Sequence, residues 1–365
     1  MTTIDLQAEP YAQYAFEDPL TGVRGWLVVD TLVDELAFGG FRFHPDVTAQ
    51  EVRDLARCMT WKLACHGLPT GGAKAGLALD PRRDDCLDIL ERFVTAVKEP
   101  LLSHVMLGKD MGASDQLIDQ IYTCLKVPQM HTTRRRRGEG NIPERLRDLQ
   151  GYCTHMTGRG VAVAAHAATG GLEDVRVGIQ GFGLVGAGSA YRLSRMGARI
   201  VALADVNQTV QGSDMPLATL IEESRTTRAI TTSLLEGDGI SFEPEAVLDA
   251  EVDLLVLAAG SHIVGPELAE RIRARIVVEG ANFALTPDAR RTLHERGIRV
   301  IPDLIASSSS AALVTRQMAS GNTLTAEACW EAIDTSISNA TLGALSRASQ
   351  RGIPVRQAYL ETYAL

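Results

Sequence analysis

Apolar and polar residues alternate along the first part of the chain in patterns typical of both strands and helices. Residues 25–30, Gly-Trp-Leu-Val-Val-Asp, predict a strand, and residues 103–107 predict another. An amphipathic helix is predicted over residues 84–98. A further helix is predicted from apolar residues at helical spacing, which are Val52, Leu55, Ala56, Met59 and Leu63. This part of the chain therefore mixes helix and strand.

The second part of the chain consists of short runs of branched apolar residues separated by helical patterns. The runs lie at residues 175–179, 199–204, 252–258, 275–278 and 298–301. Strands that alternate with helices predict a doubly wound parallel sheet of the Rossmann type. The polar, basic segment at residues 134–140 predicts a domain boundary.

These patterns predict a two-domain α/β fold. We expect residues 1–145 to form an α/β substrate-binding and catalytic domain, and residues 146–325 to form the Rossmann domain. Residues 326–365 are predicted to form C-terminal helices that pack back towards the first domain.

The composition excludes several classes of protein. The 365 residues carry a net charge of −9, which argues against a general nucleic-acid binder. No apolar run reaches the roughly 18 residues that a membrane-spanning helix needs, and the first residues, Met-Thr-Thr-Ile-Asp, do not resemble a signal peptide. The six cysteines are scattered without a CxxC pair, which indicates reduced thiols. We expect a cytoplasmic protein that does not bind membranes.

A glycine-rich turn predicts a dinucleotide site. The strand at residues 175–180 is followed by glycines at GxGxxG spacing and then by a helical pattern, so that backbone N–H groups face a pyrophosphate. The predicted turn consists of Gly181, Gly183, Leu184, Val185 and Gly186. A second strand ends at Asp205, where a carboxylate suits the ribose hydroxyls of NAD and repels a 2′-phosphate. We therefore expect NAD, the alternative being a glycine-rich turn that binds nothing.

Two lysines suggest a site that holds an anion and polarises a carbonyl. Lys62 and Lys74 stand twelve positions apart, and Lys74 follows a Gly-Gly pair. Two ammonium groups close together lower the pKa of one of them. The alternative is that both are surface lysines and that Asp110 caps a loop. His44 and His66 have no partner at metal-ligand spacing, so no metal site is expected.

Several motifs, in order along most of the chain, resemble the glutamate/leucine/phenylalanine/valine dehydrogenase family. They are residues 39–45 (Gly-Gly-Phe-Arg-Phe-His-Pro), 59–62 (Met-Thr-Trp-Lys), 68–74 (Leu-Pro-Thr-Gly-Gly-Ala-Lys), 110–112 (Asp-Met-Gly), 157–161 (Thr-Gly-Arg-Gly-Val), the glycine turn and 279–282 (Glu-Gly-Ala-Asn). The resemblance implies reversible oxidative deamination of an L-amino acid to a 2-oxo acid and ammonia. It also implies a homo-oligomer.

The resemblance implies a role for each matched residue. Lys62 would bind the substrate α-carboxylate, Lys74 would polarise the carbonyl and the attacking water, and Asp110 would be the general acid/base. Thr157 would hold the nicotinamide end, and Asn282 would lie near the cofactor.

The substrate side chain is predicted from departures within these motifs. Glutamate-specific members carry a lysine before the Gly39-Gly40 pair, where this chain has Phe38, and a hydroxyl residue where it has Val314. Neither replacement pairs a carboxylate, whose unpaired burial is expensive, so an apolar amino acid is expected. Ser307 begins a four-serine run where the family has Asn-Ala-Gly-Gly. Glutamate dehydrogenase, or a cofactor-binding member without turnover, is the alternative.

Overall fold

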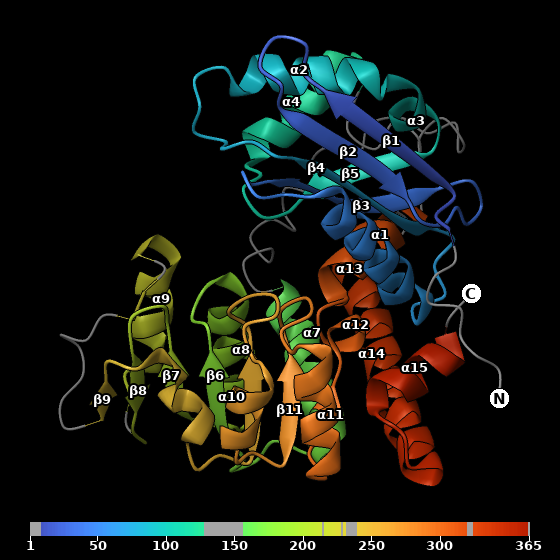
Figure 1. Ribbon diagram of the computed structural model, residues 1–365. Coiled ribbons are helices and arrows are strands. Elements are labelled where there is room, and N and C mark those ends of the chain that lie inside the picture. The colour runs from blue at the N-terminus through green and yellow to red at the C-terminus, as the bar shows by residue number, and fades with distance from the viewer. Residues whose placement is uncertain are drawn as a thin grey trace. The chain divides into compact units, whose positions relative to one another are not determined.

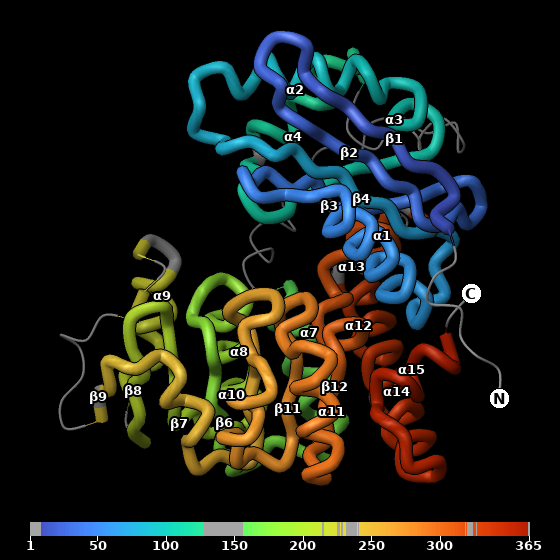
Figure 2. Tube along the Cα trace, viewed as in Figure 1, coloured from blue at the N-terminus to red at the C-terminus, as the bar shows by residue number. Residues whose placement is uncertain are grey.

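The computed structural model describes residues 9–127, 156–213, 215–227, 229–230, 239–319 and 324–363. The described residues form two compact units (Figures 1 and 2). The first unit contains residues 9–127, 311–319 and 324–329. The second contains the remaining described residues from 156 to 310 and residues 330–363. The predicted boundary at residue 145 and the basic segment at residues 134–140 lie outside the described residues.

The first unit is built on a mixed five-stranded sheet. Its strands are β1 (Ala12–Glu17), β2 (Arg24–Val29), β3 (Ala37–Phe43), β4 (Gly71–Leu77) and β5 (Val105–Lys109), in the order β1-β2-β4-β3-β5. β3 pairs in parallel with both β4 and β5, whereas β2 pairs antiparallel with β1 and β4. Figure 1 shows α1 on one face of this sheet and α2 and α4 on the other. The central strands β3 and β4 are buried throughout, so a polar group on either is enclosed.

The helices of the first unit follow their sequence signals closely. They are α1 (Ala49–Ala64), α2 (Cys86–Ala96), α3 (Lys98–Ser103) and α4 (Asp115–Leu125). α1 begins after Thr48, whose hydroxyl accepts the backbone N–H of Glu51 at 3.2 Å, and its predicted apolar stripe is confirmed as buried or partly buried. The predicted strand at 103–107 begins two residues late because Ser103 still belongs to α3 and donates to the Glu99 carbonyl at 2.6 Å.

The second unit confirms the predicted Rossmann-type sheet. Its strands are β6 (Arg176–Gln180), β7 (Arg199–Ala204), β8 (Thr209–Gln211), β9 (Ile240–Ser241), β10 (Leu254–Leu257), β11 (Ile276–Glu279) and β12 (Arg299–Ile301). The order is β12-β11-β10-β6-β7-β8-β9; β6, β7, β10, β11 and β12 are parallel, and β8 and β9 add an antiparallel edge. The chain winds from β6 to β7 on one side and later to β10 on the other. This reversal creates the crevice where doubly wound sheets bind ligands.

The helices of the second unit cover both faces of this sheet (Figure 1). They are α7 (Met156–Thr169), α8 (Leu184–Arg195), α9 (Leu217–Thr227), α10 (Pro266–Arg271), α11 (Pro287–Glu295), α12 (Asp303–Ala306) and α15 (Val355–Tyr363), together with the short helix η2 (Pro244–Asp249). Two more helices, α13 (Ser309–Ala319) and α14 (Ala326–Arg351), contain residues of both units. A buried apolar cluster joins β10 and β11 to η2, α10 and α11.

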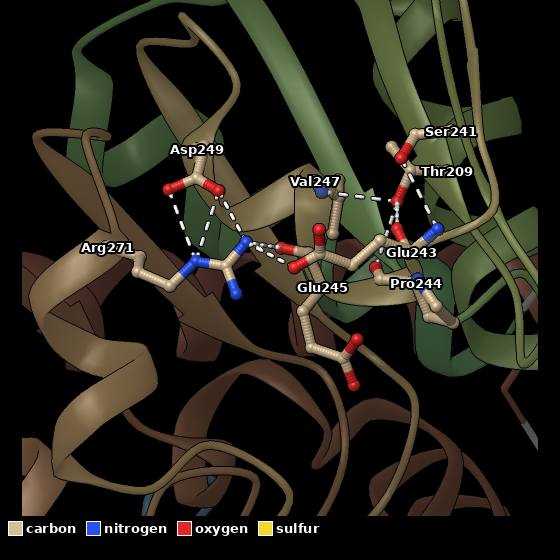
Figure 3. A network of polar contacts seen from close by, with 8 residues as sticks. All are labelled: Thr209, Ser241, Glu243, Pro244, Glu245, Val247, Asp249 and Arg271. Atoms are coloured by element: carbon tan, nitrogen blue, oxygen red, sulfur yellow. Dashed lines mark hydrogen bonds and ion pairs between the residues drawn. The ribbon is translucent and has the colours of Figure 1, made fainter.

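An ion-pair network fixes η2 against α10. Figure 3 shows Arg271, at the end of α10, pointing at Asp249 and towards the backbone near Glu245. Its guanidinium lies 2.5 Å from Asp249 Oδ2 and 2.8 Å from Glu243 Oε1. On the other side of η2, the Thr209 hydroxyl lies 2.9 Å from the Glu243 carbonyl and accepts the Val247 N–H at 3.2 Å. Strand β8 and helix α10 are thus both tied to the segment around η2.

The C-terminal helices are divided between the two units. Residues 330–363 belong to the second unit, and residues 311–319 and 324–329 belong to the first. The predicted packing of residues 326–365 towards the first domain stays a prediction. Ion pairs explain the placement: Arg159 of α7 binds Asp334 of α14 with its nearest contact at 2.6 Å, and Arg356 of α15 pairs with Asp303 of α12. Within the first unit, Arg316 of α13 donates to the His66 carbonyl at 3.1 Å.

Within the described ranges, no helix is both long enough and apolar enough to cross a bilayer. The same residues contain no group of three or more His, Cys, Asp or Glu side chains that could hold a metal ion.

Candidate active site

The predicted catalytic pair lies together in the first unit, where β4, β3 and β5 are neighbouring strands. Lys74 of β4 is 4% exposed, and its ammonium forms an ion pair with the carboxylate of Asp110, which follows β5. Glycine 40 of β3 leaves room for this pair, because a Cβ there would lie 2.8 Å from Asp110 Cβ and 3.1 Å from Lys74 Nζ. Lys74 is therefore not a surface lysine.

Close packing of α1 on β4 brings Lys62 to the same region. A Cβ on Gly72 would lie 2.2 Å from the backbone nitrogen of Thr60, so only glycine lets the last turn of α1 approach the strand. Lys62 is in that last turn and is buried. Gly39 serves a similar purpose, because a Cβ there would lie 1.7 Å from the Ala73 carbonyl oxygen. Glycines therefore set the spacing of the two lysines.

The charges in this cluster shift its protonation. Burial lowers the pKa of the Lys74 ammonium; Asp110 acts in the opposite direction, and the positive charges of Arg42 and Lys62 lower it further. For Asp110, burial alone raises the pKa of the carboxyl, but the charges of Lys74 and Arg42 outweigh burial and hold that pKa well below its usual range. The cluster thus combines an ionised carboxylate with a lysine that loses its proton more easily than a free one, mainly because it is buried and only in smaller part because of Lys62.

The structure adds a residue that the sequence analysis left without a role. Arg42 of β3 is 5% exposed, and its guanidinium contacts Asp110 on one side and Glu51 of α1 on the other. A charged residue within the otherwise apolar run 37–43 was the available signal.

The residues predicted to choose the substrate are only partly located. Phe38 is buried, and its ring lies over β5, since a Cβ on Gly108 would be 3.3 Å from Phe38 Cζ. The ring therefore contacts β5 at Gly108, two positions before Asp110 in the sequence, and is apolar there. Val314 lies on α13 in the same unit and is partly buried. Its predicted role stays a prediction.

The predicted dinucleotide turn lies at the reversal point of the second sheet. Gly181 has φ +89°, and a Cβ there would lie 2.4 Å from the Ala259 Cα in the segment after β10. A Cβ on Gly186 would lie 1.8 Å from the Gly181 carbonyl oxygen, so α8 packs directly on the turn. By contrast, a Cβ on Gly183, the N-cap of α8, would meet nothing within 4 Å. This open side at a helix N-terminus fits the pyrophosphate of a dinucleotide.

Two residues of the predicted turn lie at the start of α8. Leu184 is exposed, whereas Val185 lies beside Gly280, where a Cβ would be 3.3 Å from Val185 Cγ1. The turn is therefore in contact with the segment that follows β11 and carries Asn282.

Asp205 follows β7 as predicted, but its carboxylate organises the loop around it. Oδ1 accepts the backbone N–H groups of Asn207 at 2.8 Å and Gln208 at 3.0 Å, and Oδ2 accepts that of Ile230 at 2.7 Å. The side chain is buried. Its predicted contact with ribose stays a prediction, because these bonds already use much of the carboxylate.

Hydroxyl groups of the serine run bond to backbone carbonyls. The Ser307 hydroxyl donates to the Asp303 carbonyl at 2.8 Å, and the Ser309 hydroxyl donates to the Met156 carbonyl at 2.7 Å. Ser309 therefore fixes the start of α7, where Thr157 lies. The predicted ligand contact of Ser307 stays a prediction.

A clamp of two unusual residues holds the loop that carries Asn282. Phe283 and His262 have φ of +50° and +55°, a region that bulky side chains rarely adopt. The His262 N–H donates to the Phe283 carbonyl at 2.7 Å, and the Phe283 N–H donates to Asp303 Oδ2 at 3.1 Å. The Arg356 guanidinium pairs with Asp303 and lies 5.5 Å from the centre of the Phe283 ring. Side chains from α12 and α15 thus set the backbone next to Asn282.

Comparison with known sequences identifies relatives for both units. The sequence model of the family described as "Glutamate/Leucine/Phenylalanine/Valine dehydrogenase" matches residues 152–362. A second model, described as "Glu/Leu/Phe/Val dehydrogenase, dimerisation domain", matches residues 14–126.

Individual relatives are glutamate dehydrogenases with different cofactors. The chain is 36% identical over 282 residues to the NADP(+)-dependent glutamate dehydrogenase of Pyrobaculum calidifontis, covering 74% of this chain and 66% of that protein. It is 32% identical over 284 residues to NAD-specific glutamate dehydrogenase A of Halobacterium salinarum, covering 74% and 62%. The chain thus spans less than two thirds of the length of these relatives.

A solved structure agrees with these matches. The hetero-hexameric glutamate dehydrogenase of Thermus thermophilus, in its leucine-bound form, superposes with a TM-score of 0.79 at 26% identity, covering 96% of this chain and 86% of that one.

Proposed function

The chain belongs to the glutamate/leucine/phenylalanine/valine dehydrogenase family, and on this premise we propose that it catalyses the reversible oxidative deamination of an L-amino acid with a pyridine nucleotide. The buried Lys74–Asp110 pair, with Lys62 on the adjoining helix, is the observation that carries the proposal. A structural ion pair has no need of a second buried lysine beside it, whereas a site for a 2-oxo acid does.

The chemistry assigns one task to each charged group. Lys62 binds the α-carboxylate, and Asp110 removes a proton from the substrate ammonium, which gives the neutral amine that loss of hydride from Cα requires. A nicotinamide, when bound at the glycine turn, would supply the hydride acceptor. Lys74, in its neutral form, takes a proton from the water that adds to the iminium carbon, and the resulting ammonium stabilises the oxygen. Asp110 returns its proton to the nitrogen, and ammonia leaves as Asp110 takes the hydroxyl proton and the carbonyl forms.

Glutamate is the substrate that the comparisons support best, because the relatives reported above are named glutamate dehydrogenases. An apolar amino acid, the substrate expected from the sequence, is the second candidate. Phe38 favours it, because its buried ring occupies the position before the Gly-Gly pair and cannot pair with a side-chain carboxylate.

The cofactor is proposed to be NAD rather than NADP. Asp205 places a negative charge at the end of β7, where a 2′-phosphate would be repelled. The relatives include NADP-dependent and NAD-specific enzymes, so the choice rests on this carboxylate. A homo-oligomer in the cytoplasm is proposed with it; the related Thermus structure is described as a hetero-hexamer.

The proposal is tested by reduced-nucleotide formation, followed by near-ultraviolet absorbance, with each standard L-amino acid and with NAD or NADP. Lys74→Met should abolish turnover while nucleotide affinity stays within about twofold of wild type, since the nucleotide turn lies in the second unit. Turnover with glutamate alone would remove the Phe38 argument. Full activity of Lys74→Met would refute the mechanism.

A further inference from the structure

The Arg42 guanidinium lies between two carboxylates. Nη1 binds Glu51 of α1; on the other side Nη2 lies 3.4 Å from Asp110 Oδ1 and Nε lies 3.3 Å from Asp110 Oδ2. Nε makes no geometrically good hydrogen bond within the described residues. The Nη2 and Nε atoms, which form a fork, therefore face both carboxylate oxygens of Asp110. They act on Asp110 through their positive charge rather than through two short hydrogen bonds.

Each oxygen of Asp110 has a second partner besides Arg42. Oδ1 accepts the Met111 N–H at 2.7 Å, and Oδ2 pairs with the Lys74 ammonium. In the proposed reaction Lys74 turns to the substrate and to water, so its bond to Asp110 changes during turnover. The guanidinium cannot lose its proton in this pH range. Arg42 is thus the constant cation of the site.

Glu51 holds the other side of the fork. It lies in the first turn of α1, and its side chain is 37% exposed, whereas that of Arg42 is 7% exposed. Binding to Glu51 satisfies Nη1 and leaves the guanidinium plane aimed at Asp110. The planar geometry of arginine suits this double contact, whereas lysine supplies only a point charge.

We propose that Arg42 is a positioning residue that holds the Asp110 carboxylate oriented and ionised for proton transfer, and that Glu51 fixes Arg42 for this task. The inference rests on the proposed function, because it assigns a role towards the general acid/base of that reaction. It gives a function to a motif arginine that neither the substrate nor the cofactor assignment uses.

The charges around Asp110 define the expected pH effect. Lys74 on β4 and Arg42 on β3 face the carboxylate directly. Lys62 and Glu51 on α1 act on those two cations, and Lys109 precedes Asp110 on β5. Removing Arg42 takes away one of two cations that lower the pKa of Asp110, so this pKa should rise. The base then becomes protonated at a higher pH, and the acid limb of kcat moves upward.

The test compares pH profiles of kcat for wild type, Arg42→Met, Arg42→Lys and Glu51→Gln. Arg42→Met should move the acid limb upward by roughly 1–3 pH units and lower kcat by at least tenfold at neutral pH. Arg42→Lys should restore most of the limb position but not all of kcat, because it keeps charge and loses the fork. Glu51→Gln should lower kcat with less movement of the limb.

A control on the same helix is Arg53→Met, which removes an ion pair with the exposed Glu9 and should leave the profile unchanged. An unchanged acid limb in a folded Arg42→Met variant would overturn the inference. Equal losses of kcat in Arg42→Met and Arg42→Lys would also overturn it. If Arg42→Met does not fold, Arg42→Lys and Glu51→Gln carry the same test through the split between kcat and KM.

A readout without turnover separates this inference from the proposed function. The Asp110 carboxyl carbon, identified by its loss in Asp110→Asn, is titrated by NMR in wild type and Arg42→Met. An upward shift in the methionine variant supports the inference even if no amino acid is oxidised, and that lack of oxidation would refute the proposed function alone. Identical titration curves would refute the inference.

Discussion

Replacing Arg356 by methionine should destabilise the second unit and loosen the loop that carries Asn282. The Asp303 side chain is fully buried and that of Arg356 is 16% exposed, so their ion pair lies almost wholly out of water. Arg356→Met keeps the aliphatic length of the side chain but removes its charge. The carboxylate of Asp303 is then left in the protein interior without this cation.

The expected loss follows from two opposing quantities. Removing one partner of a buried ion pair costs about 3–5 kcal/mol. The loop then relaxes and releases part of the roughly 1–3 kcal/mol stored where a bulky residue has positive φ, as Phe283 does at +50°. The free energy of unfolding should therefore fall by about 2 kcal/mol, the difference between the middles of the two ranges.

The assay is a double-mutant cycle of Asp303→Asn and Arg356→Met, measured by urea unfolding and by hydrogen exchange of the Phe283 amide. The double variant should be more stable than the sum of the single losses predicts, with a coupling of about 1–3 kcal/mol. Arg351→Met is the control, because it breaks a more exposed pair with Glu361 between α14 and α15 and should cost less than about 1 kcal/mol. A loss below about 1 kcal/mol in Arg356→Met, or a coupling below about 0.5 kcal/mol, would refute the reasoning.

Three further predictions address pH, the nucleotide turn and the loop after β7. Burial lowers the pKa of His66 from 6.5 to about 4. Between these two pH values the unfolded chain binds more protons than the folded protein, so the free energy of unfolding falls as pH drops through them, by about 3 kcal/mol in all. His66→Gln should flatten this part of a plot of unfolding free energy against pH. Gly186→Ala should weaken nucleotide binding at least tenfold in a fluorescence titration, because its Cβ meets backbone at 1.8 Å. Gly183→Ala, whose Cβ meets nothing within 4 Å, should melt like wild type. Equal behaviour of the two variants in titration and in melting would contradict this prediction. Asp205→Asn should lower stability by about 1–3 kcal/mol through weakened backbone hydrogen bonds and should shift the nucleotide preference from NAD towards NADP, because it removes the charge that repels a 2′-phosphate; an unchanged NAD/NADP ratio would contradict the choice of NAD.

The parallel strands of the second unit were predictable because each is a short run of branched residues between helical patterns. The edge strands β8 and β9 were not, since they have three and two residues and depend on partners rather than on their own pattern. The placement of α15 was also beyond sequence reasoning. It follows from an ion pair between residues 53 positions apart, and nothing in either segment alone marks Asp303 as buried.

The candidate site divides in the same way. Lys74 and Asp110 were found because they lie in motifs, and the structure brings them together. The position of Asp205 was also predictable, but its burial under three backbone N–H groups was not, because two of them come from the following turn and one from Ile230. Arg42 was noted as part of a motif in the sequence, but its role could be inferred only from its distances to Asp110 in the structure.

The clamp on Phe283 also bears on how the protein is made. The loop that carries Asn282 receives its last restraint from Arg356, which is translated 73 residues after Phe283 (356 − 283). During synthesis, strand β11 and its neighbours can pair well before α15 has left the ribosome. A chain that ends between Asp303 and Arg356 would contain the glycine turn and most of the sheet. Its loop would lack the clamp, and Asp303 would lack its ion pair with Arg356. The conformation of the loop that carries Asn282 thus depends on a segment that is translated well after the strand it follows.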